Sequence, residues 1–182
     1  RGDEAELVAF RGSPLATRAE AAGLRVYTVG RPGARLQAAL HLKGLLNRRR
    51  FDVVHCHEAH SLTAAWIAGA HRRAAVVASR RVAYPLSGGR LALDRYRRAR
   101  RIIAVSRFVR DSVVASGLLA EQVEVIYDGV LLPPPSERKP VFSRIGCVGY
   151  LLPEKGQEVL VRALPLVREK HRDCRLILAG DG

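Results

Sequence analysis

The chain has 182 residues, 48% of them hydrophobic, and carries a formal net charge of +14 at pH 7. This length allows one sizeable domain or parts of two. No apolar stretch approaches the roughly 20 residues that cross a bilayer, and aromatic residues (5%) are not interleaved with the basic runs. A soluble or peripheral protein is therefore expected, and nucleic acid is disfavoured as a partner.

Apolar runs of strand length alternate with segments of helical periodicity along the whole chain. Strands are expected at residues 6–10, 25–29, 52–57, 74–79, 102–105, 123–127, 145–149 and 175–180. Helices are expected at residues 14–22, 33–49, 61–71, 91–98, 106–116 and 155–170. Because the runs are continuously apolar and separated by helices, they predict an α/β fold of doubly wound, Rossmann-type parallel sheets covered on both faces.

The segment at residues 132–140 interrupts this rhythm, since it contains four prolines and no apolar periodicity. It predicts a linker between a Rossmann-like domain at residues 1–131 and the first βαβ unit of a second domain at residues 141–182. The chain contains no methionine, begins just before one expected strand and stops directly after another. We therefore expect a fragment that lacks the first strand of one domain and most of the other.

A loop that contains Lys155 follows the strand expected at residues 145–149 and precedes a helix. Backbone N–H groups and the helix dipole favour a phosphate at such a junction, and a lysine adds a full charge. The alternative is an ordinary turn with a solvated lysine, because the loop matches neither GxGxxG nor GxxxxGK[ST].

Three cysteines, Cys56, Cys147 and Cys174, lie far apart in or beside apolar runs. This spacing is typical of buried free thiols in a reducing compartment, and not of a disulfide framework or a zinc site. It favours a cytoplasmic location.

Several segments in this order resemble the retaining nucleotide-sugar glycosyltransferases of the GT-B fold, family 4. They are FDVVHCHEAHS, ARRIIAVSRFVRDSVVASGLLAEQVEVIYDGV, the proline-rich linker, IGCVGYLLPEKGQEVLVRALPLV and RLILAGDG. The resemblance implies an acceptor-side first domain and a second domain that binds a nucleoside diphosphate sugar. This donor is a substrate, and the family generally needs neither a cofactor nor a bound metal.

For the donor site, the resemblance assigns the loop from Gly149 to Gly156. Lys155 matches the family's diphosphate-binding lysine, and the two glycines let the backbone approach the phosphates. Tyr150 stands where the family usually has an arginine. This change removes a charge-assisted contact of about 1.5–3 kcal/mol.

For the acceptor side, the resemblance points to His57 and Arg80 as candidate catalytic residues. His57 ends an expected strand, although a core histidine is an equal alternative. Arg80 stands where the family commonly has an active-site histidine, so it would bind a phosphorylated or carboxylated acceptor but cannot act as a base near neutral pH. Ser106 is expected mainly as a helix N-cap, and Asp128 as part of a turn.

The implied reaction transfers a sugar to an acceptor hydroxyl with retention of anomeric configuration. A glutamate pair that the family uses would lie beyond Gly182, so these 182 residues alone are predicted to be inactive. Two alternatives remain open: a metal-dependent hydrolase built on His55 and His57, with His60 nearby, and a non-catalytic domain that binds nucleotides or anionic glycans.

Basic clusters at residues 48–50 and 90–110 would suit an anionic membrane surface. The helix at residues 33–49, with Leu36, Leu40, Leu45 and Leu46 expected inward, would either touch lipid or, more commonly, cover a sheet. Family members often act at the cytoplasmic face of a membrane on glycan or lipid-linked acceptors. We therefore expect a cytoplasmic protein, peripheral at the inner membrane, in cell-envelope glycan or lipopolysaccharide synthesis.

Overall fold

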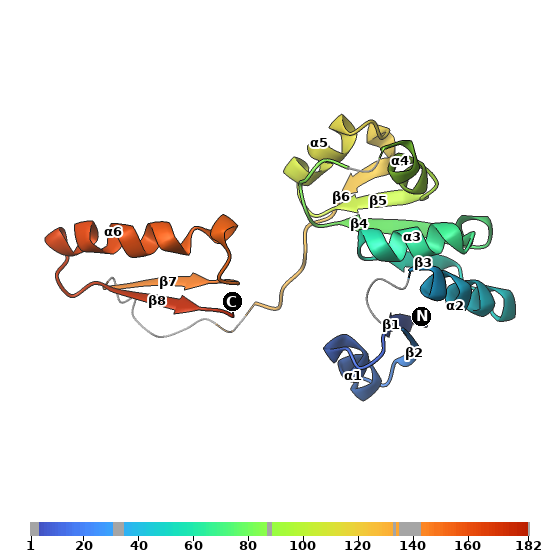
Figure 1. Cartoon of the computed structure of the whole chain (residues 1–182), viewed down its shortest axis with the longest axis horizontal. Coiled ribbons are helices and arrows are strands. Elements are labelled where there is room, and N and C mark those ends of the chain that lie inside the picture. The colour runs from blue at the N-terminus through green and yellow to red at the C-terminus, as the bar shows by residue number, and fades with distance from the viewer. Residues whose placement is uncertain (1–3, 31–34, 87–88, 133, 135–142, 182) are drawn as a thin grey trace. The chain divides into compact units, whose positions relative to one another are not determined.

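The computed structural model describes residues 4–30, 35–86, 89–132, 134 and 143–181 (Figure 1). The chain divides into two compact units, Arg1–Val130 and Leu131–Gly182. Most of the linker expected at residues 132–140 lies outside the described residues.

The first unit contains two parallel sheets. One pairs β1 (Glu6–Phe10) with β2 (Arg25–Val29), which α1 (Pro14–Ala21) connects. The other has the strand order β3-β4-β5-β6, formed by Val53–Cys56, Ala75–Arg80, Arg101–Ala104 and Val123–Val125. Arg49, which precedes β3 in the chain, contacts the sheet of β1 and β2. Its guanidinium pairs with Glu6 of β1 and donates to the Tyr27 hydroxyl of β2 at 3.1 Å.

Helices connect the strands of the first unit. They are α2 (Arg35–Arg48), α3 (Ala59–Ile67), α4 (Gly89–Arg97) and α5 (Arg107–Ala115), with the 3-10 turns η1 (Ala70–Arg72) and η2 (Ala120–Gln122). Local sequence sets several ends. Ser13 caps α1 ahead of a proline, and helix α3 stops before Gly69, whose φ of 70° suits glycine.

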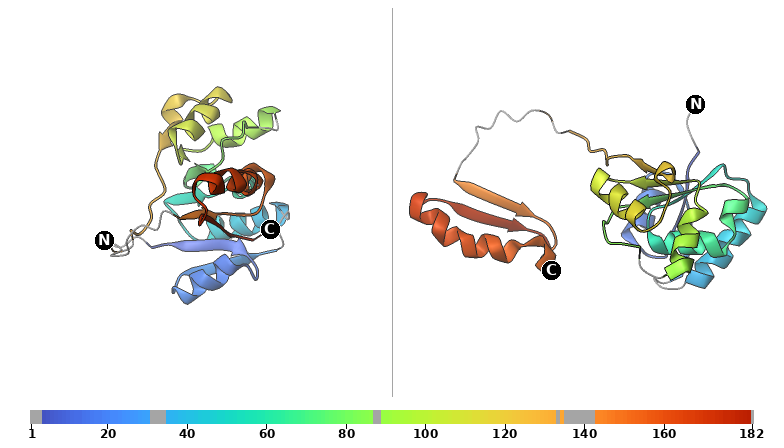
Figure 2. Two further views of the ribbon diagram at one scale, coloured as in Figure 1. Left: turned by 90° about the vertical axis from the view of Figure 1, so that its left-hand side faces the viewer. Right: turned by 90° about the horizontal axis from the view of Figure 1, so that it is seen from above.

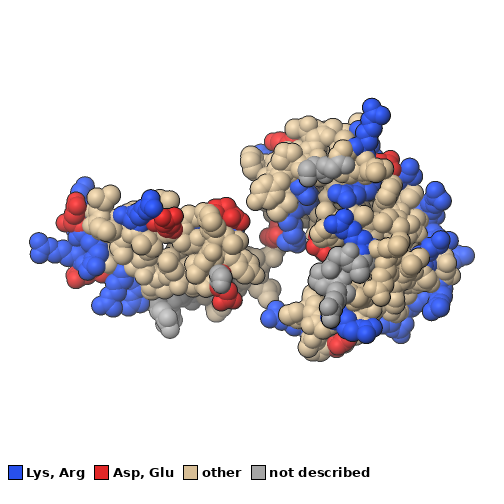
Figure 3. All heavy atoms as spheres, viewed as in Figure 1, with Lys and Arg blue, Asp and Glu red and all other residues tan. Residues whose placement is uncertain are grey.

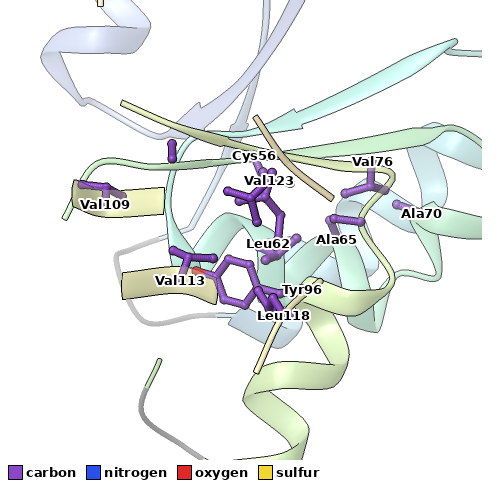
Figure 4. Packing of buried hydrophobic residues seen from close by; sticks show 14 of the residues in the cluster. Cys56, Leu62, Ala65, Ala70, Val76, Tyr96, Val109, Val113, Leu118 and Val123 are labelled. Atoms are coloured by element: carbon purple, nitrogen blue, oxygen red, sulfur yellow. The ribbon is translucent and has the colours of Figure 1, made fainter. Parts of the chain in front are cut away.

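The hydrophobic core of the first unit lies on one face of the four-stranded sheet. Tyr96, Leu62, Ile102 and Val113 are its largest fully buried side chains. Figure 4 labels Tyr96, Leu62 and Val113 among the packed residues of this core. Strand residues of this core, such as Ala78 and Ile102, pack with side chains from α2, α3, α4 and α5. Figure 2 shows from two further sides how these helices gather along the sheet. The other face of this sheet leaves Val53 exposed at the start of β3 and buries Ser79 near the end of β4.

The second unit is a single βαβ motif. Its strands β7 (Arg144–Val148) and β8 (Arg175–Ala179) pair in parallel, and α6 (Gln157–Lys170) connects them after the 3-10 turn η3 (Pro153–Lys155). Val148 is 88% exposed and Ile177 is 52% exposed. One helix thus leaves apolar strand residues on the surface of this sheet.

The α/β class with parallel sheets, predicted from the sequence, is confirmed. The expected inward orientation of Leu36 and Leu40 is wrong, since both are 63% exposed. Ala39 and Leu46 are the buried residues of α2. Seven residues span about two helical turns, so Ala39 and Leu46 lie on one face of α2.

Candidate functional site

The loop after β7 is held against the end of β8 by backbone hydrogen bonds. Gly149 N donates to the carbonyl of Ala179, and Leu151 N donates to the carbonyl of Asp181, both at 2.9 Å. Pairing between the two chain segments therefore continues past the ends of the strands. This fixes the loop at the carboxyl edge of the sheet, where ligands of α/β proteins bind.

Gln157 closes the same loop from the opposite end. Its side chain is 8% exposed, and its Nε2 donates to the carbonyl of Tyr150 at 2.8 Å. Gly156, with a φ of 70°, makes the turn from η3 into α6. Sequence reasoning missed the role of Gln157, because a polar residue in the first turn of a helix is usually solvated.

The electrostatics of this loop suit an anion. The Lys155 side chain is exposed and lies two residues before the start of α6, where unpaired backbone N–H groups favour negative charge. Glu154 and Glu158 oppose this, although Glu158 is paired with Arg162. The ring of Tyr150 is 68% exposed. All four residues predicted for the donor site, Gly149, Tyr150, Lys155 and Gly156, thus lie in one ordered loop.

A second group of polar side chains lies at the carboxyl ends of β3 and β4. His55 Nε2 and Ser79 Oγ are hydrogen-bonded at 2.8 Å. The rings of His55 and His57 lie against each other, with centroids 4.1 Å apart and planes tilted by 32°. Partial burial, followed by the charges of His57 and Arg81, lowers the pKa of His55 below its usual range, so its imidazole is neutral at pH 7.

Arg80 and Arg81, at the same sheet edge, differ in their hydrogen-bond and ion-pair partners. Arg80 Nη2 donates to the carbonyl of Tyr84 at 2.5 Å, while its Nε is buried and has no hydrogen-bond partner in the described part of the chain. Arg81 forms an ion pair with Asp128 at 2.7 Å, and both groups are about half exposed. The structure thus brings His57 and Arg80 to one sheet edge, without a direct hydrogen bond between them among the described residues.

Ser106 and Asp128 have structural partners. Ser106 Oγ accepts from Val109 N at 3.2 Å, which confirms its role as the N-cap of α5. Asp128 belongs to the turn after β6 and, through Arg81, ties that turn to the end of β4. The sequence did not predict this ion pair, because 47 residues separate its members.

A cavity of about 410 Å³ lies at the carboxyl ends of β1 and β2. Its lining is formed by Arg11, Thr28, Val29, Gly30, Gln37 and His41. They come from β2, from α2 and from the residues directly after β1 and β2, and the sequence did not mark Arg11, Gln37 and His41 as neighbours.

The described residues contain no group of three or more histidine, cysteine or acidic side chains placed to hold a metal ion. His55 and His57 lie against each other, but they have no third ligand among these residues, so the hydrolase alternative gains no support. None of the described helices combines the length and apolar character needed to span a bilayer.

Solved structures of glycosyltransferases share this fold. The chain is 20% identical to HepE of Anabaena, solved with UDP and glucose. The structural match covers 97% of this chain and 53% of HepE, with a TM-score of 0.72. With the lipopolysaccharide outer core galactosyltransferase WaaB, it shares 14% identity over 97% of itself and 68% of that chain, with a TM-score of 0.54. The chain thus spans between about half and two thirds of these structures.

Sequence comparisons identify the family. The chain is 31% identical over 93 residues to the GPI3 subunit of phosphatidylinositol N-acetylglucosaminyltransferase of Saccharomyces cerevisiae. The matched segment covers 45% of this chain and 21% of the yeast protein. A family model described as Glycosyltransferase Family 4 matches residues 1–132, most of the chain. The chain therefore belongs to glycosyltransferase family 4.

Proposed function

We propose that the complete protein transfers a sugar from a nucleoside diphosphate sugar to an acceptor hydroxyl with retention of anomeric configuration. One observation carries the donor assignment: Lys155 and the amino end of α6 lie together in a loop that Gln157 and the Ala179 carbonyl hold in place. Family membership and the UDP bound to HepE support it.

In this proposal, the loop binds the diphosphate that becomes the leaving group. Negative charge grows on the diphosphate as the glycosidic bond breaks, and a lysine with helix N–H groups stabilises that charge without rearrangement. Tyr150 leaves the site one arginine short of the family pattern, so Lys155 carries a larger share of the electrostatic stabilisation. The 182 residues alone are expected to be inactive.

The acceptor side is proposed at the carboxyl edge of β3 and β4, with His57 and Arg80 facing a glycan or lipid-linked acceptor. The name of WaaB suggests cell-envelope glycan or lipopolysaccharide synthesis as the setting. Leu36 and Leu40 are exposed on α2, one turn apart, with Lys43 following. An apolar pair beside a cation suits shallow contact with an anionic leaflet. We therefore propose a cytoplasmic protein, peripheral at the inner membrane.

The donor assignment is tested with the full-length protein and a panel of nucleotide sugars, by thermal shift and by NMR of the product's anomeric proton. One sugar nucleotide should bind, and Lys155→Ala should weaken its binding about tenfold or more, since a charge-assisted contact is lost. Lys170→Ala, at the other end of α6, is the matched control. Equal effects of the two substitutions, or an inverted product, would contradict the proposal.

The membrane assignment is tested by flotation with anionic and neutral liposomes. Basic side chains are spread over the visible face of the first unit in Figure 3, so charge alone predicts some salt-sensitive binding. A Leu36→Ser/Leu40→Ser double variant should lose the binding that remains at high salt. If it floats as the parent protein does, or if the parent binds neither liposome, α2 is not a membrane contact.

A further inference from the structure

The cavity at the carboxyl ends of β1 and β2 is lined by four polar side chains that make no hydrogen bond to the described part of the protein. They are the side chains of Arg11, Thr28, Gln37 and His41. The volume of about 410 Å³ lies within the range of about 300–1,000 Å³ that is typical of small-molecule pockets. Ligands of parallel α/β sheets bind beyond this edge. Polar groups that converge on such a cavity without partners in the chain are available to a ligand.

Backbone hydrogen bonds fix the part of the cavity that follows β1. Arg11 N donates to the carbonyl of Val29 at 2.9 Å, so the chain after β1 stays paired with the end of β2. Two residues further on, Ser13 N donates to the carbonyl of Phe10 at 3.1 Å, and the Ser13 side chain caps α1. The Arg11 side chain therefore belongs to a short turn that is held at both ends.

Helix α2 supplies one wall of the cavity with Gln37 and His41, which lie one turn apart on the same face. The Gln37 amide lies so close to Gly30 that a β-carbon at position 30 would overlap Gln37 Oε1. Glycine at this position thus leaves the space that the amide occupies. The His41 ring lies at a tilt to the ring of Tyr27 in β2, with centroids 6.5 Å apart. Contacts with β2 and the residue after it therefore place both side chains.

The chemistry of the lining favours an uncharged, hydroxyl-rich ligand. Among the described residues it holds no acidic side chain, which disfavours a cation, and Arg11 is its single guanidinium or ammonium group. A lone exposed guanidinium binds an anion only weakly in water. The hydroxyl, amide and imidazole groups offer both donors and acceptors, as the hydroxyl groups of a ligand require. Val29, which is 7% exposed, adds an apolar part on which the C–H face of a sugar ring can lie.

We propose that this cavity binds one uncharged sugar ring through its hydroxyl groups. Arg11 donates to hydroxyl oxygens, Gln37 both donates and accepts, and Val29 packs against the ring. This inference goes beyond the proposed sugar transfer. None of the lining residues belongs to the loop at residues 149–156 or to β3 and β4, so binding in the cavity and the transfer reaction stand or fail separately.

Saturation-transfer NMR on the full-length protein tests the site with the methyl glycosides of glucose, galactose and N-acetylglucosamine. At least one glycoside should give a saturable signal. Arg11→Met and Gln37→Ala should each raise its dissociation constant about three- to tenfold, the effect of one lost hydrogen bond. Arg18→Met, at an exposed arginine of α1, is the charge-matched control and should change nothing. No saturable signal from any of the three glycosides, or equal effects of Arg11→Met and Arg18→Met, would overturn the proposal.

Gly30→Ala separates a direct role of Gln37 from a general effect of substitution. The added β-carbon displaces the Gln37 amide, so this variant should weaken glycoside binding as Gln37→Ala does. In the Gln37→Ala background it should have no further effect, because the two substitutions remove the same contact. Additive effects would contradict the placement of the amide. Should Gly30→Ala lower the urea midpoint, Thr28→Val, which removes one hydroxyl group, takes its place and should weaken binding about three- to tenfold.

Two further arms separate this cavity from the other proposed sites. Lys155→Ala and Arg80→Gln should leave glycoside binding unchanged, and its loss in either variant would overturn the assignment to the cavity. Inorganic phosphate, against chloride at equal ionic strength, should not displace the glycoside, and displacement would overturn the uncharged class. Glycoside binding without sugar transfer would defeat the proposed function alone, whereas transfer without glycoside binding would defeat this inference alone.

Discussion

Gly149 and Gly180 approach so closely that a β-carbon at position 180 would overlap the carbonyl oxygen of Gly149. The two residues directly follow β7 and β8, and the hydrogen bond from Gly149 N to the Ala179 carbonyl draws them together. The contact places the start of the loop at residues 149–156, the proposed donor loop, against the end of the neighbouring strand. The absence of a side chain at position 180 is thus a condition for the loop's geometry.

Gly180→Ala should destabilise the second unit by about 1–3 kcal/mol, because the backbone must move to relieve the overlap. The urea midpoint of the full-length protein and its donor affinity should both fall. Gly146→Ala within β7 is the control, since a β-carbon there meets nothing within 4 Å. A Gly180→Ala variant as stable as Gly146→Ala would refute this packing contact.

Gly156→Ala should disturb the donor loop through its backbone. The φ of 70° at Gly156 costs a residue with a β-carbon about 1–2 kcal/mol, although no neighbouring atom would clash. We expect a lower urea midpoint and weaker donor binding. Gly44→Ala within α2 serves as the comparison and should be neutral or stabilising, since alanine is the better helix former. Unchanged donor binding in Gly156→Ala would show that this turn is not part of the donor site.

Cys56 should resist thiol reagents until the protein unfolds. Cys56 is 2% exposed. This burial raises the pKa of its thiol to about 12, and a hydrogen bond to Ser61 offsets the rise only in part. At pH 8 only about one molecule in 10⁴ then carries the reactive thiolate. Mass spectrometry after iodoacetamide treatment should find Cys147, which is half-buried, modified well before Cys56. Equal rates for the two in the native protein would contradict the burial of Cys56.

His71 should make the protein less stable in mild acid. Partial burial lowers the pKa of His71 below its usual range, and the charges of Arg98 and Arg72 lower it further, with a smaller opposite effect from Asp94. The unfolded chain therefore binds a proton more readily than the folded one. Stability is full above the usual histidine pKa, near 6.5, and falls as the pH drops below it.

The pH dependence of the urea midpoint measures this effect. His71→Gln should flatten the decline below pH 6.5, because glutamine does not titrate. His60→Gln, an exposed position on α3, controls for the loss of a histidine as such. If His71→Gln declines as steeply as the parent protein, another group is responsible.

The sequence by itself was sufficient to locate the strands, the helices and the loop that contains Lys155. Both are local: the bounds of β1 and β2 match the apolar runs at residues 6–10 and 25–29, and the loop with Lys155 joins one strand to the next helix. A strand or a turn depends on residues close together in the chain, so its pattern is visible without coordinates.

Only the tertiary structure decided what surrounds each side chain. Leu36 and Leu40 were expected inward, but the surfaces that α2 meets bury Ala39 and Leu46 instead. The Arg81–Asp128 ion pair and the unpartnered Nε of Arg80 arise where strand ends distant in sequence meet at one sheet edge. Burial, charge pairing and register are properties of such non-local contacts, so the sequence could point to His57 and Arg80, but the partners of the side chains at this sheet edge required the fold.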